Sequence, residues 1–165
     1  MRFAAATALV CYSLAVLPAG AVEIPCNVTA NVTDPDPAGL NVRSGPSGKV
    51  IGTLQNNGDW IEVHIKGMDG DWYVIDKATQ IGANETVLFS GRGYVHKTKV
   101  GVSGLQESAV IYTDHDDKSR VLVSSADGDQ PTALLACWGD FYQVHIKAGT
   151  GWTKTVCNNE FTTCS

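Results

Sequence analysis

The sequence predicts an all-β fold made of two small units in tandem. Short β-prone runs recur from Leu40 onward, and turn-forming groups such as NNGD at 56–59 separate them. Several runs alternate polar and apolar residues, which is the period of a strand, and no stretch after residue 21 has the period of an amphipathic helix. Related strings also occur twice, GDWY at 70–73 and GDFY at 139–142, which predicts two copies of one unit of roughly 60 residues.

The first 21 residues are predicted to be a secretory signal peptide. Arg2 precedes an apolar run over 3–17, and small residues at 19–21 follow Pro18 in the pattern that a signal peptidase requires. The apolar run is too short to span a bilayer. We therefore expect cleavage after Ala21 and a periplasmic or secreted bacterial protein without membrane insertion.

The mature chain is predicted to be acidic. Loss of Arg2 leaves 11 basic against 17 acidic residues, a net charge of −6, and the basic residues form no cluster. Such a charge balance argues against nucleic acid or an anionic lipid surface as a partner. We expect no cofactor and no metal.

Four cysteines remain after loss of Cys11 with the signal peptide, and an even number in an exported chain predicts two disulfides. No Cys-x2-Cys or His-x3-His spacing supports a zinc site instead. The favoured pairing joins Cys137 to Cys157 within the second unit and Cys26 to Cys164 across the ends. The alternative pairs Cys157 with Cys164 and leaves Cys26 to reach Cys137.

The expected organisation after the signal peptide has three parts. Residues 22–38, with DPDP at 34–37, are predicted to be an extended lead-in because proline continues neither a helix nor a central strand. The two units are predicted at 39–101 and 105–165, the first carrying an insertion at 76–90 before its last strand.

Four strings in the first unit resemble the bacterial SH3 (SH3b) domain family: LNVRSGPS at 40–47, VIGTL at 50–54, GDWYV at 70–74 and GYVH at 93–96. The second unit keeps the order of strands and a closing Gly-Trp, and it is the more divergent copy. The resemblance implies two half-open, SH3-like barrels of five or six strands and a binding role. In this family such a role means attachment to peptidoglycan or to protein partners.

The candidate ligand contacts are Asn41, Arg43, Trp60, Tyr73 and Trp138. The resemblance places Asn41, Arg43 and Tyr73 where the family's groove forms, and it implies that Trp72 packs the barrel. Trp60 and Trp138 fall near loops, where an aromatic side chain is free to stack on a sugar. Arg43 is suited to a carboxylate of a peptide stem.

We expect no catalytic activity. His64 and His145 lie in matching strand strings, and a strand histidine on the polar face is usually a surface residue, because a general base needs a positioned partner within hydrogen-bond reach. Pairing of the four cysteines would remove a thiolate nucleophile, and DHDD at 114–117 lacks the glycine and distal glutamate of a calcium loop. The expected function is recognition of peptidoglycan or its stems. The alternatives are a protein–protein interaction factor of the envelope, such as an inhibitor, immunity or assembly subunit, and a second unit that only supports the first.

Overall fold

The computed structural model describes residues 22–55, 57–107, 109–124 and 133–158. Within these residues the protein is all-β, as predicted, with one short 3-10 helix, η1 (Lys97–Lys99). The predicted signal peptide, Cys11 and Cys164 lie outside the described residues. None of the described segments forms a helix with the length and hydrophobicity needed to cross a membrane.

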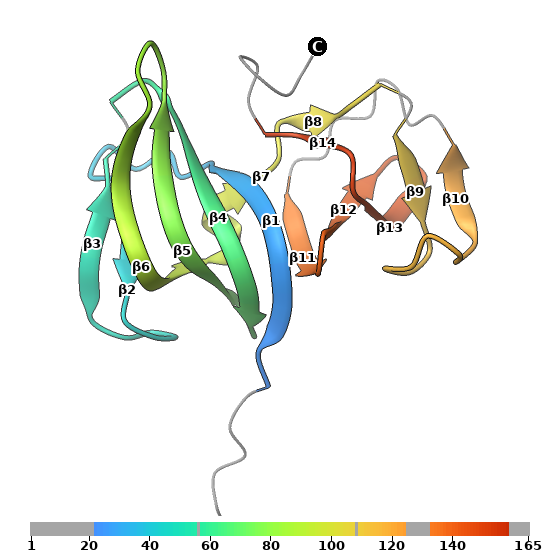
Figure 1. Ribbon diagram of the computed structural model, residues 1–165, viewed down its shortest axis with the longest axis horizontal. Coiled ribbons are helices and arrows are strands. Elements are labelled where there is room, and N and C mark those ends of the chain that lie inside the picture. Colours follow the sequence, from blue (N-terminus) through green and yellow to red (C-terminus); the bar gives the residue numbers. More distant parts are fainter. Residues whose placement is uncertain (1–21, 56, 108, 125–132, 159–165) are drawn as a thin grey trace, which may run out of the picture.

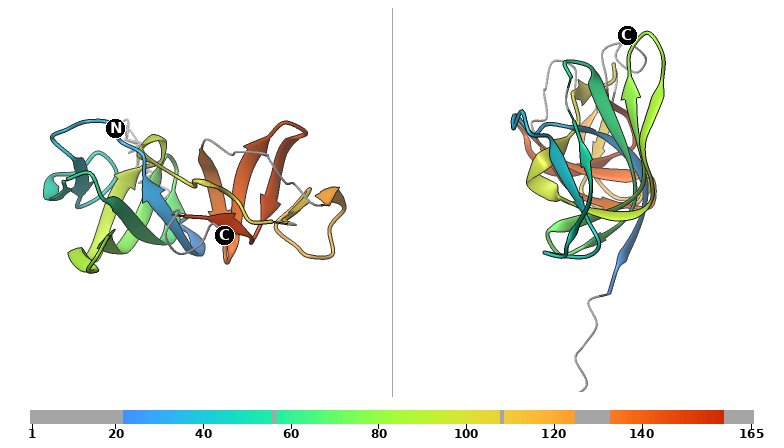
Figure 2. Two further views of the ribbon diagram at one scale, coloured as in Figure 1. Left: turned by 90° about the horizontal axis from the view of Figure 1, so that it is seen from above. Right: turned by 90° about the vertical axis from the view of Figure 1, so that its left-hand side faces the viewer.

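Seven strands of the first half of the chain form one sheet in the order β3-β2-β6-β5-β4-β1-β7. The sheet curls into a half-barrel around buried side chains (Figures 1 and 2). In β4 the residues Ile61, Val63 and Ile65 are buried, and Trp60, Glu62 and His64 are half-buried on the other face, which confirms the predicted alternation. The strands are β1 (Ile24–Val32), β2 (Leu40–Arg43), β3 (Val50–Leu54), β4 (Trp60–Asp69), β5 (Trp72–Ile81), β6 (Thr86–His96) and β7 (Val100–Gly101).

The second half forms a five-stranded sheet, β10-β9-β13-β12-β11, and a two-stranded sheet, β14-β8. The two halves lie side by side (Figure 2). The strands are β8 (Gly104–Leu105), β9 (Val110–Tyr112), β10 (Val121–Ser124), β11 (Leu134–Trp138), β12 (Phe141–Ile146), β13 (Gly149–Thr153) and β14 (Val156–Cys157).

The two halves have the same strand order. Adding seven to each strand number of the first sheet gives β10-β9-β13-β12-β11-β8-β14, which is the arrangement of the second half with one break between β11 and β8. The registers also agree, because Arg43 faces Tyr94 in the first half and Tyr112 faces Trp152 in the second. The register therefore relates the residues of the two halves position by position.

Two glycine pairs follow the same correspondence. Gly70 and Gly139 open the equivalent hairpin turns with φ of 58° and 51°, a conformation that favours glycine. A Cβ atom on Gly93 would lie 2.3 Å from Val42, and one on Gly151 would lie 2.4 Å from Ile111. A glycine at these positions lets β6 approach β2, and β13 approach β9, this closely.

The expectation of a lead-in at 22–38 needs correction. Residues 24–32 form β1, which pairs with β4 and β7 inside the first sheet. Cys26, Val28 and Ala30 are buried in alternation, so this segment contributes to the core. The predicted boundary at residue 39 therefore leaves out a strand of the first sheet.

The predicted insertion at 76–90 lengthens two strands instead of interrupting them. β5 and β6 continue as one hairpin, with pairs from Trp72↔His96 to Gln80↔Thr86. Gly91 has a positive φ of 112° inside β6. The strand accommodates this residue as an irregularity.

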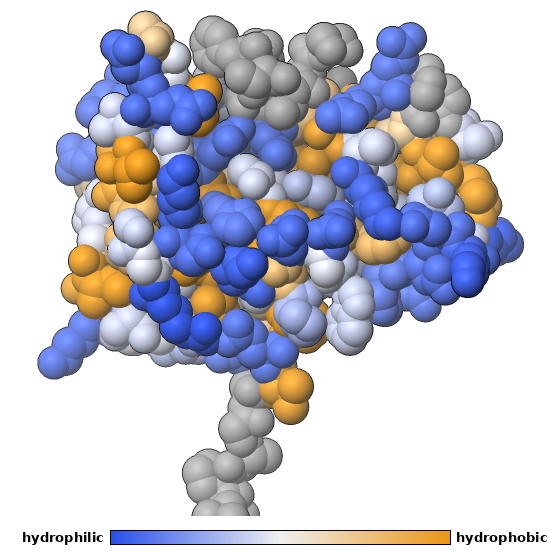
Figure 3. Space-filling view, viewed as in Figure 1, coloured by the Kyte–Doolittle hydropathy of each residue, from blue (hydrophilic) through white to orange (hydrophobic). Residues whose placement is uncertain are grey.

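The surface seen in Figure 3 is mainly hydrophilic, and hydrophobic residues gather at its two lateral ends, over β3 and over β10. Val50 and Ile51 on β3 are 48% and 49% exposed, and Val121 on β10 is 46% exposed. Both strands are edges of their sheets.

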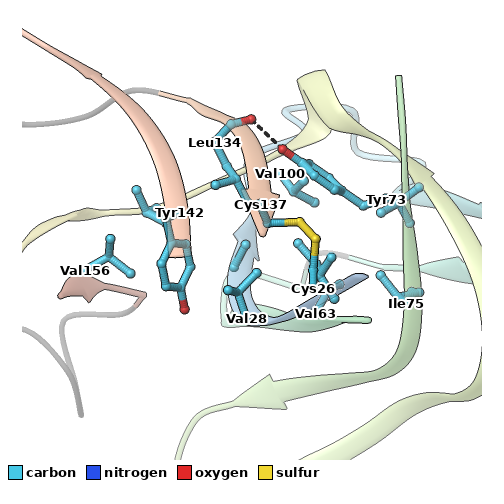
Figure 4. Close-up of a cluster of buried hydrophobic side chains, with 14 of the residues drawn as sticks. Cys26, Val28, Val63, Tyr73, Ile75, Val100, Leu134, Cys137, Tyr142 and Val156 are labelled. Atoms are coloured by element: carbon cyan, nitrogen blue, oxygen red, sulfur yellow. Dashed lines mark hydrogen bonds between the residues drawn. A yellow bond between two sulfur atoms is a disulfide. The ribbon is translucent and has the colours of Figure 1, made fainter. Parts of the chain in front are cut away.

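A disulfide between Cys26 and Cys137 joins β1 to β11 and so links the two halves (Figure 4). The favoured pairing of Cys137 with Cys157, which would stabilise the second half alone, is therefore wrong. The bond agrees with the alternative in which Cys26 reaches Cys137, and with export. The pairing of Cys164 stays a prediction because this residue lies outside the described residues.

Hydrogen bonds support the contact between the halves. The Asn27 amide donates to the Gly139 carbonyl at 2.7 Å, and the Gly139 amide donates to the Pro25 carbonyl at 2.9 Å. The Tyr73 hydroxyl donates to the Leu134 carbonyl at 2.8 Å (Figure 4). One cluster of buried apolar residues extends through both halves, so they share a core.

Candidate functional site

A shallow groove of about 250 Å³ lies beside β2 and the C-terminal end of β6. We call it the Arg43 groove. It is lined by Asp34, Asp36, Gly39, Leu40, Asn41, Arg43, Trp72, His96 and Lys99. These residues come from distant parts of the first half, and the sheet order brings them together.

Arg43 is the cation best placed to meet a ligand. It ends β2, where pairing with Tyr94 on one side and Val50 on the other fixes its backbone. Its Nη1 donates to the Gly48 carbonyl at 2.9 Å, which holds the half-buried side chain in the groove. In the part of the chain that the structure describes, Arg43 has no ion pair, and most of its five N–H donors remain available.

Lys99 is neutralised within the groove. Its Nζ lies 2.8 Å from Asp34 Oδ1, and the Asp34 side chain is only 7% exposed. Asp36 accepts a hydrogen bond from the Ala38 amide at 2.9 Å, which orders the segment before β2. Arg43 is therefore the cation of this groove for which the described residues show no ion pair.

Trp72 and His96 form an aromatic wall. Their rings meet edge to face with centroids 5.1 Å apart, because the two residues are paired across β5 and β6. His96 Nδ1 lies 2.8 Å from the Thr98 hydroxyl. The neighbouring Asp71 has a pKa below its ordinary value, mainly because Lys97 donates a hydrogen bond to its carboxylate.

The predicted ligand contacts are divided among different places. Asn41 and Arg43 lie together in the Arg43 groove. Trp60 is half-buried beside another groove of about 230 Å³, lined by Val32, Gly58, Asp59, Trp60 and Ile61. Trp138 is 43% exposed and belongs to the second half.

Tyr73 is a correction to the predicted site. Its side chain is fully buried, and burial raises the pKa of its hydroxyl. Because it packs between the halves and hydrogen-bonds Leu134, it is not open to a ligand. Alternation along β5 explains this: Tyr73 points to the core, and its neighbour Trp72 points to the groove.

Sequence reasoning missed Trp72, His96, Lys99 and Asp34 as members of the groove. Trp72 was expected in the core, but it is half-buried and faces the groove. His96 closes the GYVH string, so its place at the end of the last long strand was a usable signal. No local pattern connects Asp34 to Lys99, because their contact depends on the pairing of β1 with β7.

A second groove of about 190 Å³ occupies the equivalent place in the second half, and we call it the Lys154 groove. By register, Tyr112 stands where the first half has Arg43, and Val110 where it has Asn41. Lys154 lies 2.6 Å from Asp117 and 4.4 Å above the ring of Phe141. The hydrogen bond with Asp117 raises the pKa of Lys154. This groove therefore lacks the arginine of the first.

Comparisons of the chain with protein-family models, with curated proteins and with solved structures found no match.

Proposed function

We propose that this chain is an exported, non-catalytic binding protein built from two SH3b-like modules, and that the Arg43 groove binds carboxylate-bearing peptides such as the stems of peptidoglycan. The equal strand order of the two halves and the two equivalent glycine pairs support duplication of one module. The family strings at 40–47 and 93–96 contribute the two elements on which Arg43 and His96 stand.

We infer the class of ligand from Arg43, which has no ion pair among the described residues and lies beside the aromatic wall of Trp72 and His96. A guanidinium presents its donors in a planar fork that matches a carboxylate, and Trp72 gives an apolar surface for the adjoining side chain. Asp36, an exposed carboxylate on the same rim, suits a ligand that also carries an ammonium group. Peptidoglycan stems combine these groups.

Co-sedimentation of the mature protein with insoluble peptidoglycan tests the proposal. We expect enrichment over an unrelated protein of similar charge, and an apparent affinity about tenfold lower for Arg43→Gln, because one charge-assisted contact is lost. Arg120→Gln is the matched control, since Arg120 is an exposed arginine of the equivalent loop in the second half. Lack of enrichment of the unmodified protein would overturn the proposal.

The second candidate is a protein-binding factor of the envelope. The exposed apolar residues of edge strand β3, Val50 and Ile51, favour it, because an open edge can add a strand from a partner. One stoichiometric protein recovered from envelope extract, without binding to peptidoglycan, would favour this function over the first.

A further inference from the structure

Three aromatic rings cluster on one face of the second half. The His115 ring contacts two indoles, with its centroid 4.4 Å from that of Trp138 in a tilted arrangement and 5.2 Å from that of Trp152 edge-on. Trp138 nevertheless leaves 43% of its surface exposed. This aromatic cluster therefore offers an open aromatic surface at the end of β11.

The register explains why these rings share a face. Trp138 is the cross-strand partner of Phe141, and Trp152 is the partner of both Gln143 and Tyr112. Side chains of direct partners point the same way, as do residues two apart along β12. His115 reaches this face from the loop between β9 and β10.

The loop that carries His115 is held in place. The Thr113 amide donates to the Arg120 carbonyl at 2.9 Å, and the Lys118 amide donates to Asp116 Oδ1 at 2.9 Å. His115 Nδ1 lies 2.6 Å from Asp114 Oδ1, whose side chain is 63% exposed. A fixed imidazole and an accessible carboxylate thus stand beside the open indole.

The fold does not require this aromatic cluster. At the positions equivalent to Trp138 and Trp152, the first half has Asp69 and Tyr94, and it forms the same hairpins with an aspartate in place of the exposed indole. An exposed tryptophan that the fold does not need is a surface available for binding.

We propose that Trp138, supported by His115 and Trp152, stacks on the pyranose ring of an amino-sugar glycan, with Asp114 accepting a hydrogen bond from a sugar hydroxyl. The flat apolar face of a pyranose fits an indole, and the rim of hydroxyls fits an exposed carboxylate. The inference deepens the proposed function, since the glycan strand of peptidoglycan is such a ligand, and it uses residues separate from the Arg43 groove.

The Cys26–Cys137 disulfide positions the aromatic cluster relative to the first half. Trp138 directly follows Cys137, so the covalent link between the halves also fixes the position of the cluster. A glycan on the second half and a peptide stem on the first would then be held by one rigid unit. Joint binding increases avidity when both sites are engaged on one polymer.

Titration of the mature protein with a soluble N-acetylglucosamine tetramer, followed through the indole N–H signals in NMR spectra, tests the inference. We expect the signals of Trp138 and Trp152 to shift and those of Trp60 and Trp72 to stay. Trp138→Ala should lower the affinity about tenfold or more, and His115→Ala several-fold. The control is Val87→Ala, at an apolar residue of β6 that is 55% exposed and lines neither groove, and it should bind like the unmodified protein.

Shifts confined to Trp60 or Trp72, or no shift at all, would overturn the inference. So would an equal response of Trp138 to choline, which would indicate a cation cage. Arg43→Gln separates this inference from the proposed function, because it should weaken binding of stems and leave the tetramer titration unchanged. Peptidoglycan binding with no response to the tetramer would sink the glycan site alone.

Discussion

Tyr73 shows how one hydroxyl contributes to the union of the two halves. The side chain is fully buried, and its hydroxyl donates to the Leu134 carbonyl at 2.8 Å. Tyr73→Phe would leave that carbonyl without its donor, so we expect a loss of about 1–3 kcal/mol in the free energy of unfolding. Urea denaturation measures it, and Tyr112→Phe on the half-buried outer surface is the control, expected to change stability little.

The same residue predicts an alkaline dependence of stability. Burial raises the pKa of Tyr73 in the folded state, while an unfolded tyrosine loses its proton near about pH 10. Above that pH the unfolded state binds fewer protons than the folded state, so stability is full below it and falls as pH rises. Tyr73→Phe should flatten this fall. Tyr142, whose pKa burial also raises, should retain part of it, and an unchanged slope would contradict the assignment.

At the residue scale, the sequence could predict that Arg43 lies in the groove but not that Tyr73 is buried. The LNVRSGPS string fixes where Arg43 stands in its strand, and the groove contains it. Tyr73 and Trp72 are adjacent, and only the orientation of β5 decides which of the two faces the core. Two adjacent aromatic residues in a strand do not carry that information by themselves.

At the scale of elements, β1 was not predicted as a strand because of its amino-acid composition. Asparagine, threonine and proline made the segment resemble a linker, yet Cys26, Val28 and Ala30 alternate as buried residues. The period of two was present in the sequence. The hairpins were easier to predict, because the Gly-Asp turns at 70–71 and 139–140 mark them directly.

The β11–β12 turn depends on the backbone conformation of Gly139. Gly139 has a φ of 51°, and a Cβ atom added there would touch nothing, so substitution acts through backbone strain alone. We expect Gly139→Ala to cost about 1–2 kcal/mol in the free energy of unfolding, measured by thermal or urea denaturation. Gly45→Ala is the matched control, since its Cβ is also free of contacts and its φ is not positive. Equal effects of the two changes would contradict this account.

At the scale of the whole molecule, the similar strand order of the two halves could be predicted from the sequence, and the contact between the halves could not. The related strings at 70–73 and 139–142 predict similar halves, but no sequence pattern in either half predicts that β1 lies against β11. The second half has a break in its sheet between β11 and β8, and β1 of the first half lies on that side through the Cys26↔Gly139 bridge. The favoured pairing of Cys137 with Cys157 was wrong because it placed both cysteines of a disulfide within the second half, whereas the bond links the two halves.

The link between the halves gives the last prediction. Cys26 and Cys137 are 111 residues apart, so their bond removes much of the conformational freedom of the unfolded chain. We expect the double variant Cys26→Ser/Cys137→Ser to lose about 2–5 kcal/mol in the free energy of unfolding. A non-reducing peptide map should recover Cys26 linked to Cys137, and Cys157 linked to Cys164, the pair that remains if cleavage after Ala21 removes Cys11. A Cys137–Cys157 peptide would contradict the arrangement. The single-site variants Trp138→Ala and Arg43→Gln should each lose one activity, glycan binding or stem binding. The double cysteine variant should retain both activities but bind the polymer with lower avidity. This combination would show that the disulfide holds the two sites in one rigid body.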